Sequence, residues 1–170
     1  KAGNLYNGRD KGRIYRISAS DAGPASWTSQ LNLNDSTDVQ LVEKLSNPNI
    51  WWRRNAQRLL VDRNHEIVVP ELIKMAQNTQ SSLGRLLALW TLEGMNKLTP
   101  EFGMQALGDP EPGVRENAIK LAELHLDAWP DLVPKLLALK EDNNAKVRYQ
   151  LLCTLGSINT PEASEARQEL

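Results

Sequence analysis

Four arginines stand at nearly regular intervals and are the first residues whose charge and spacing could do chemistry. They are Arg53, Arg85, Arg115 and Arg148, separated by 32, 30 and 33 residues. Such a row could form a basic track for an acidic ligand. However, Asp109 and Asp142 each precede one of these arginines by six residues, and an arginine can bind a carboxylate together with the carbonyls of a turn. We therefore predict a structural arginine ladder, in which each arginine holds the turn of its own segment or of the next one.

The densest group of aromatic and cationic residues is Trp51, Trp52, Arg54 and Arg58. Tryptophan faces beside guanidinium groups suit the binding of sugars, peptides or anions, which makes these four residues the candidate binding surface. Adjacent residues on a helix point about 100° apart, so we expect one tryptophan in the core and the other exposed. Core packing, or docking against an N-terminal loop through Trp27, is the favoured interpretation, and ligand binding is the alternative.

Residue types that carry catalysis or bind metals are otherwise sparse. His65-Glu66, and His125 with Glu123 and Asp127, are isolated groups, and no second histidine follows His65 at the spacing of a zinc protease motif. Neither a Gly-x-Ser-x-Gly run nor a phosphate-binding glycine loop occurs. The sequence therefore predicts surface histidines, no catalytic residue, no metal site and no cofactor within these residues.

Cys153 is the single cysteine, which excludes an internal disulfide and a cysteine-rich zinc site. It stands between Leu152 and Leu155 in an apolar stretch. Free cysteines are often buried as small hydrophobic side chains, so we expect Cys153 to be buried.

Composition indicates an ordinary globular chain without an overall positive charge, although local charged patches remain possible. Hydrophobic residues make up 41% and charged residues 24%, with a formal net charge of −1. The overall field therefore gives no reason to expect nucleic acid or an anionic membrane as a partner. The longest apolar run, residues 86–90, is far shorter than the roughly 20 residues of a spanning helix, so we expect no direct membrane insertion.

From Ser36 onward the chain is rich in leucine and alanine, and similar segments recur. Aligned on the four arginines, three segments carry a turn dipeptide starting six residues upstream: Asn47-Pro48, Asp109-Pro110 and Asp142-Asn143. The second segment has Thr79-Gln80 at this place. Amphipathic stretches precede the turns, at residues 39–45, 67–76, 102–107 and 132–139, and others follow them. Each repeat is therefore predicted to contain two helices, which bury their apolar stripes by stacking on neighbouring repeats.

A turn Asp or Asn, a Val-Arg pair and a following alanine, as in Asp109, Val114-Arg115 and Ala118, resemble the HEAT-repeat pattern. The short period is similar to that of bacterial HEAT-like repeats related to those of phycobilisome lyases. The resemblance covers residues 36–160 and implies an all-α fold, an armadillo-like α-α superhelix or solenoid of four full repeats. Residues 161–170 would form a partial fifth repeat. Small residues would let adjacent helices approach closely at Ala56, Ala88 and Ala118.

Residues 1–34 differ from the rest because they lack helical periodicity and contain glycine at positions 3, 8, 12 and 23. Asp10-Lys11-Gly12 predicts a turn, and residues 13–17 are β-prone, so we expect a short extended or hairpin segment followed by a loop. The chain is therefore divided into residues 1–34 and a helical repeat domain at residues 35–170.

Residues 5–17, which include Gly12-Arg13-Ile14-Tyr15-Arg16, resemble the closing strands of a β-propeller of the quinoprotein sugar-dehydrogenase type. Membrane-bound dehydrogenases similar to that group continue with a HEAT-like segment, and residues 48–60 resemble a motif within it. The resemblance implies a larger exported protein, periplasmic or extracellular, with a propeller before these residues and a cytochrome-c-like domain after them. The sequence itself contains no Cys-x-x-Cys-His haem motif.

Two functions fit these features. The first is a non-catalytic scaffold, a monomer whose second helices offer side chains to a protein or glycan partner, or to neighbouring domains of the same polypeptide. The alternative is a structural segment of a quinoprotein-like dehydrogenase whose active site lies outside these residues. The Gly12 to Arg16 run favours the second function, and the lack of a recognisable site within these residues favours the first.

Overall fold

The computed structural model describes residues 21, 23 and 32–170. The β-prone run at residues 13–17 and the loop residue Trp27 lie outside the described residues. The helical unit comprises Leu33–Leu170, and the regular secondary structure in the described part is entirely helical. The prediction of an all-α fold is therefore confirmed for this part of the chain.

Helices follow one another in pairs joined by short turns. The first helices of the pairs are α1 (Asp38–Lys44), α3 (Val69–Ala76, after the 3₁₀ helix η3, Glu66–Val68), α5 (Pro100–Leu107) and α7 (Leu132–Leu137, continued by the 3₁₀ helix η4, Ala138–Glu141). The second helices are α2 (Ile50–Arg63), α4 (Ser82–Gly94), α6 (Pro112–Glu123) and α8 (Ala145–Leu155), and α9 (Pro161–Glu169) follows the last pair. Predicted and observed first helices agree to within a few residues at each end.

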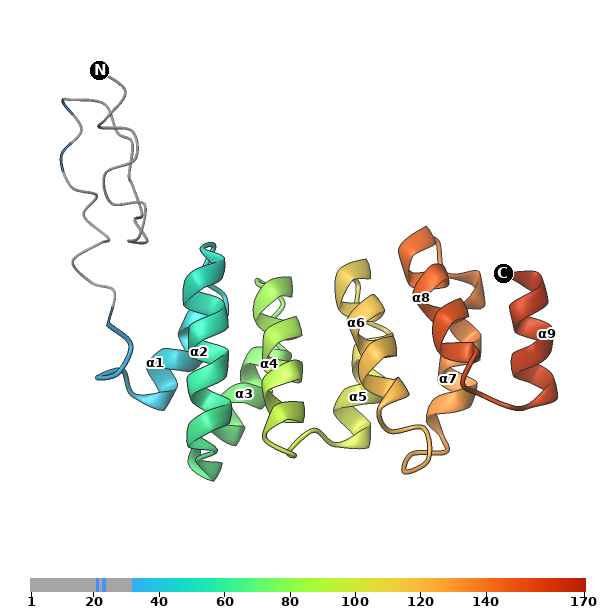
Figure 1. Cartoon of the computed structure of the whole chain (residues 1–170), viewed down its shortest axis with the longest axis horizontal. Helices are drawn as coiled ribbons and strands as arrows, with labels where there is room; N and C mark the ends of the chain where they lie inside the picture. Colours follow the sequence, from blue (N-terminus) through green and yellow to red (C-terminus); the bar gives the residue numbers. More distant parts are fainter. Residues whose placement is uncertain (1–20, 22, 24–31) are drawn as a thin grey trace, which may run out of the picture. The chain divides into compact units, whose positions relative to one another are not determined.

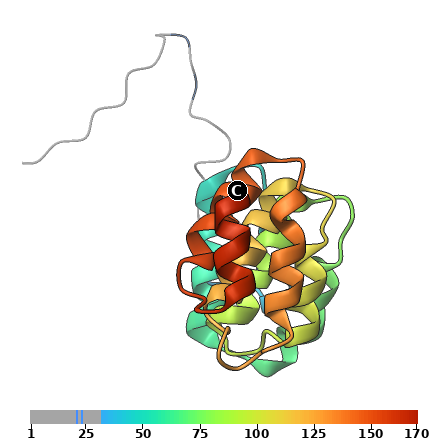
Figure 2. The ribbon, with the colours of Figure 1, turned by 90° about the vertical axis from the view of Figure 1, so that its right-hand side faces the viewer.

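The second helices lie side by side in one row, with α2 against α4, α4 against α6 and α6 against α8 (Figure 1). The first helices lie behind them in the same view. Figure 2 looks along the row from its C-terminal end, where α9 packs against α7 and α8. The row places equivalent residues of successive second helices next to one another.

Local sequence explains where these helices begin. The side chain of Asn49 accepts a hydrogen bond from the Trp51 N–H at the start of α2. At the start of α8, the side chain of Asn144 accepts a hydrogen bond from the Lys146 N–H. The Ser81 hydroxyl accepts one from the Gly84 N–H at the start of α4. Such caps satisfy N–H groups that have no partner within the helix. Proline in the first turn of α5, α6 and α9 loses no hydrogen bond there.

Buried apolar side chains gather in two clusters. The first is built by α1 to α4 and includes Leu41, Leu72 and Leu92. The second extends from α4 to α9 and includes Leu89 and Leu151. Helix α4 therefore contributes to both clusters. The expected small positions, Ala56, Ala88 and Ala118, are at most 1% exposed.

Cys153 is exposed, so its predicted burial is wrong. Leu151 and Leu155 of the same helix are fully buried. A residue two positions from Leu151 points about 200° away around the helix. The apolar neighbours in sequence were therefore no guide to the direction of the thiol.

No helix in the described part of the chain is both long and apolar enough to cross a membrane.

Candidate functional site

An asparagine or aspartate opens the turn between the two helices of each pair: Asn47, Asn78, Asp109 and Asp142. Each side-chain Oδ1 accepts a hydrogen bond from the backbone N–H two residues later, at 2.8–2.9 Å. This is the Asx turn, in which a short polar side chain replaces a backbone acceptor. The same turn is thus built four times.

Each of the four predicted arginines donates through Nη1 to the carbonyl of its own turn residue. The distances are 2.6 Å for Arg53 and Asn47, 2.9 Å for Arg85 and Asn78, 2.7 Å for Arg115 and Asp109, and 2.6 Å for Arg148 and Asp142. In the second pair the acceptor is Asn78, seven residues before the arginine, and not Thr79 as the sequence alignment placed it. That turn is one residue longer than the others.

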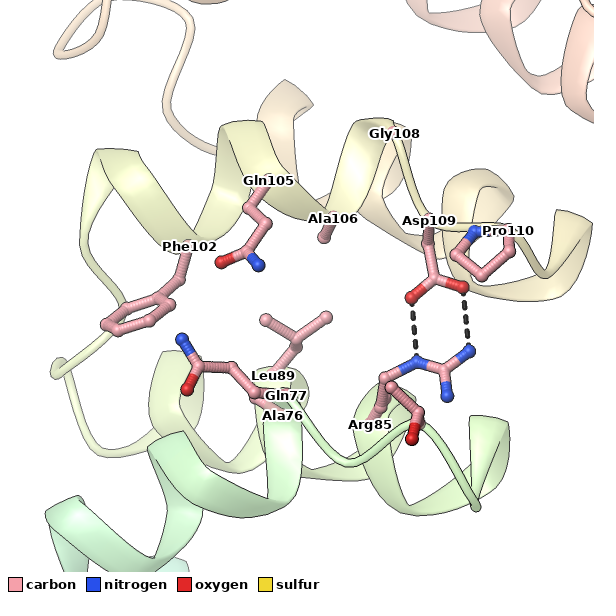
Figure 3. Close-up of a pocket in the computed structure, with 11 residues that line it drawn as sticks. Ala76, Gln77, Arg85, Leu89, Phe102, Gln105, Ala106, Gly108, Asp109 and Pro110 are labelled. Carbon is pink, nitrogen blue, oxygen red and sulfur yellow. Dashed lines mark hydrogen bonds and ion pairs between the residues drawn. The ribbon is translucent and has the colours of Figure 1, made fainter.

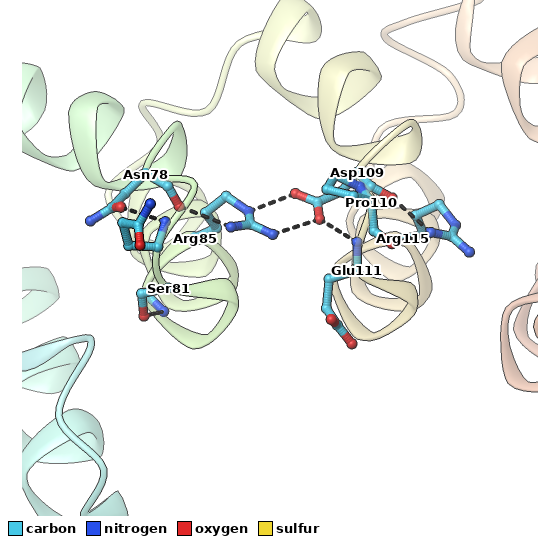
Figure 4. Close-up of polar contacts among 9 residues, drawn as sticks. Asn78, Ser81, Arg85, Asp109, Pro110, Glu111 and Arg115 are labelled. Carbon is cyan, nitrogen blue, oxygen red and sulfur yellow. Dashed lines mark hydrogen bonds and ion pairs between the residues drawn. The ribbon is translucent and has the colours of Figure 1, made fainter.

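Two of the arginines also bind the aspartate of the following turn through both remaining donor groups. Nε and Nη2 of Arg85 lie 2.7 and 2.8 Å from the Asp109 carboxylate (Figure 4). Those of Arg115 lie 2.7 and 2.9 Å from Asp142. The sequence left open whether each arginine binds the carboxylate of its own segment or that of the next one. In both pairs the arginine binds the carboxylate of the next segment.

These two ion pairs are largely shielded from solvent. The side chains of Arg85 and Asp109 are each 9% exposed, and those of Arg115 and Asp142 are 15% and 6% exposed. Hydrogen bonding to the aspartates raises the pKa of Arg85 and of Arg115. The bond from Arg115 in turn lowers the pKa of Asp142. Paired geometry of this kind positions helices relative to each other.

Trp51 and Trp52 point in different directions at the start of α2. Trp52 is half-buried and packs against the first apolar cluster, while Trp51 is 42% exposed. The two rings meet edge to face with centroids 4.9 Å apart, and Lys44 Nζ lies 5.6 Å from the Trp52 ring centroid. Trp52 therefore belongs to the packing of α1 and α2, and Trp51 remains on the candidate surface.

Arg54 and Arg58 are both exposed and lie on successive turns of α2. Together with Trp51 and the 58% exposed Ile50 they line a shallow depression on this helix. The structure thus brings three of the four candidate surface residues to one side of α2.

Sequence reasoning missed how this surface continues along the row of second helices. At the positions equivalent to Trp51, Arg54 and Arg58, α4 carries Leu83, Leu86 and Trp90, and α8 carries Lys146, Tyr149 and Cys153. Leu83 is 45% and Tyr149 is 68% exposed. We call the side of α2, α4, α6 and α8 that carries these positions the row face. An alignment of the second helices on the four arginines would have identified these equivalent positions from the sequence.

A cleft of about 200 Å³ lies between α3 and α5 and was not predicted. Leu89 lies at its base, Gln77 and Gln105 stand on opposite sides, and the Arg85–Asp109 pair closes one end (Figure 3). Pockets for small organic ligands usually measure at least about 300 Å³. The cleft is therefore of a size for a single side chain.

The histidines are each paired with one carboxylate. His65 Nδ1 lies 2.8 Å from Asp38, and His125 Nε2 lies 2.7 Å from Glu93. The His125 ring stacks on Trp129 with centroids 3.8 Å apart, so His125 is half-buried and not a simple surface residue. Within the described residues, no group of three His, Cys, Asp or Glu residues is arranged to hold a metal ion.

No protein-family model matches this chain, and a comparison with curated proteins gives no match. The resemblance to HEAT repeats, and to the segment of membrane-bound dehydrogenases, stays a prediction from the sequence patterns.

Proposed function

We propose that this chain is a non-catalytic helical-repeat scaffold that binds a protein partner or a neighbouring domain of its own polypeptide. In this proposal the helix pairs form an α-α superhelix of HEAT-like type, with four full repeats and a partial fifth that begins at α9. The turn network supports it, because the Asx residues follow one another after 31, 31 and 33 residues and make the same contacts each time.

The row face carries the proposal of binding. Stacked repeats present equivalent side chains as one extended surface, which such proteins use for recognition. At α2 this surface exposes Ile50 and Trp51 beside two arginines. Tryptophan and arginine are the residue types that contribute most to protein interfaces. A partner that covers Trp51 would remove apolar surface from water.

Selection of short random peptides on the whole chain tests this proposal. We expect enriched peptides that bind the purified chain in fluorescence anisotropy, and whose affinity falls by about tenfold or more for Trp51→Ala. Ile67→Ala is the matched control, because Ile67 is 85% exposed and lies on η3. Unchanged affinity for the Trp51 variant would place binding elsewhere, and failure to enrich any peptide would contradict a peptide-binding role.

The second proposal is that the chain is a structural segment of a larger exported dehydrogenase, periplasmic or extracellular, with its active site in another part. The run Gly12-Arg13-Ile14-Tyr15-Arg16 supports this alternative. Reading the coding sequence on both sides of these residues tests it. We expect propeller blades upstream and a Cys-x-x-Cys-His box downstream, and flanking sequence without either feature would contradict it.

A further inference from the structure

Arg54 and Arg58 differ from every other arginine that the structure describes. Six arginines donate hydrogen bonds to carbonyl, carboxylate or hydroxyl oxygens: Arg53, Arg63, Arg85, Arg115, Arg148 and Arg167. For Arg54 and Arg58, no acceptor lies within hydrogen-bonding distance among these residues, and no carboxylate forms an ion pair with them. Their positive charge is therefore available at the surface.

The two arginines have a defined spacing along the helix backbone. Arg54 and Arg58 are four residues apart on α2, which corresponds to a rise of about 6 Å along the helix. Asp62 stands one turn further on and lines the same depression. The available positive charge is consequently confined to residues 54–58 of the helix, next to Trp51.

At the equivalent positions, α4 adds apolar surface, and the two charged side chains of α6 are paired with each other. On α4 these positions are held by Leu83, Leu86 and Trp90, and the Trp90 Nε1–H donates to Asn117 at 3.0 Å. On α6 the side chains of Glu116 and Lys120 pair with each other at 2.7 Å. A partner that matches this surface therefore carries negative charge over α2 and apolar side chains over α4.

We infer that the partner segment bound at α2 is acidic, with two carboxylates about 6–7 Å apart and an apolar side chain next to them. Glutamates at positions i and i+4 of a helix, or acidic residues at i and i+2 of an extended peptide, have this spacing. The apolar side chain would pack on Trp51 and Ile50. This inference rests on the proposed function and specifies its ligand.

A nucleic acid is the less suitable partner for this surface. A phosphate backbone is bound by a track of cations, whereas the available charge here ends at Arg58 and is followed by Asp62. Neutralisation of two arginines by two carboxylates matches the surface, because charge-assisted bonds to arginine are bidentate and well oriented.

The composition of the peptides selected on the whole chain tests the inference. We expect enrichment of acidic pairs at the two spacings given above, beside leucine, phenylalanine or tryptophan. The affinity of such a peptide should fall by about tenfold or more for the double variant Arg54→Gln, Arg58→Gln, and should weaken as salt is raised. The variant Lys74→Gln, Lys135→Gln removes two exposed charges from α3 and α7 and should leave the affinity unchanged.

The outcomes separate the inference from the proposed function. Neutral or basic peptides that lose affinity with Trp51→Ala but not with the arginine variant would overturn the inference and leave the binding role intact. A single-stranded oligonucleotide that displaces the peptides and binds more tightly than they do would also overturn it. If no peptide of any composition is enriched, the binding role itself fails.

Discussion

Arg85 and Arg115 each make two kinds of contact at once, and only a guanidinium group can do so. One nitrogen donates to the turn carbonyl of the arginine's own segment, while Nε and Nη2 together bind the next carboxylate. A lysine offers a single point charge in place of this planar fork. The arginine therefore fixes both its own turn and the distance to the following one.

Replacement of Arg115 by alanine should destabilise the chain by about 1–3 kcal/mol, because the largely buried Asp142 would lose its partner. Urea unfolding measures this loss. Arg148→Ala is the control and should cost less, since Arg148 forms no ion pair and its one hydrogen bond within the described residues goes to the carbonyl of its own turn. An Arg115 variant of full stability would contradict the structural role and suggest that this arginine serves a ligand.

Asn78→Asp should stabilise the chain by about 1 kcal/mol. Asn78 occupies the place that Asp109 and Asp142 hold in later turns, and a carboxylate there would give Arg53 the ion pair that Arg85 and Arg115 have. The gain should vanish in an Arg53→Ala background, as a double-mutant cycle would show. Asn47→Asp is the matched control, because no ladder arginine precedes that turn in the described residues.

Stability should decrease in acid partly through Asp142. Its folded-state pKa is lowered by the bond from Arg115, so the folded chain binds this proton less readily than the unfolded chain. The stabilisation is fully present above the unfolded pKa of about 4, and it is lost as the pH falls through the folded-state value. Urea titrations between about pH 6 and pH 2 should show a shallower decline for Asp142→Asn than for the parent. Equal slopes would contradict this assignment.

The sequence predicted which side chains form the ladder but not which carboxylate each arginine binds. The arginines and the aspartates recur at the same interval, so the sequence fits an ion pair within one segment as well as an ion pair with the next segment. The choice depends on how closely the second helices pack, which is a tertiary property. Asn78 was missed because the second turn has one additional residue, and a fixed interval of six then points to Thr79.

At the scale of the helix, α2 divides its two tryptophans between inside and outside. Trp52 stands where α6 and α8 carry the buried Val114 and Val147, whereas Trp51 stands where α4 carries the exposed Leu83. Helical periodicity predicted such a division, and the equivalent valines could have assigned Trp52 to the inside.

Trp52→Ala should therefore cost roughly 2 kcal/mol, about half of the value for a fully buried tryptophan, while Trp51→Ala should change stability by less than about 0.5 kcal/mol. Chemical denaturation followed by circular dichroism measures both. Similar losses for the two variants would show that Trp51 is also part of the packing.

The helices themselves were predictable because their apolar stripes are regular, and the cleft between α3 and α5 was not. Its walls come from residues such as Gln77 and Gln105, which carry no distinctive pattern in the sequence. The cleft exists because α3 and α5 stand apart in the folded chain, and this separation cannot be read from the sequence.

For the whole helical unit, the two apolar clusters meet at α4, where Ala88 and Leu92 face one and Leu89 faces the other. Contacts between the helices lie mainly within a pair or between adjacent pairs, so local damage should stay local. Leu151→Ala should destabilise its surroundings by about 2–5 kcal/mol and raise hydrogen exchange in α6 and α8. Exchange in α1 and α2 should remain close to that of the parent, and Leu72→Ala should give the reverse pattern. Uniform acceleration in both variants would indicate a single cooperative unit.

The forward direction of the arginine contacts has a consequence for the evolution of chain length. Arg85 and Arg115 both bind the aspartate of the segment that follows. A gene duplication or deletion between equivalent points would join an arginine to a turn that already suits it, so the ion pair across the new junction would be kept. Units that begin with an acidic turn residue are interchangeable in this sense. A unit that begins with a neutral residue such as Asn78 can be joined as well, but without an ion pair across the junction.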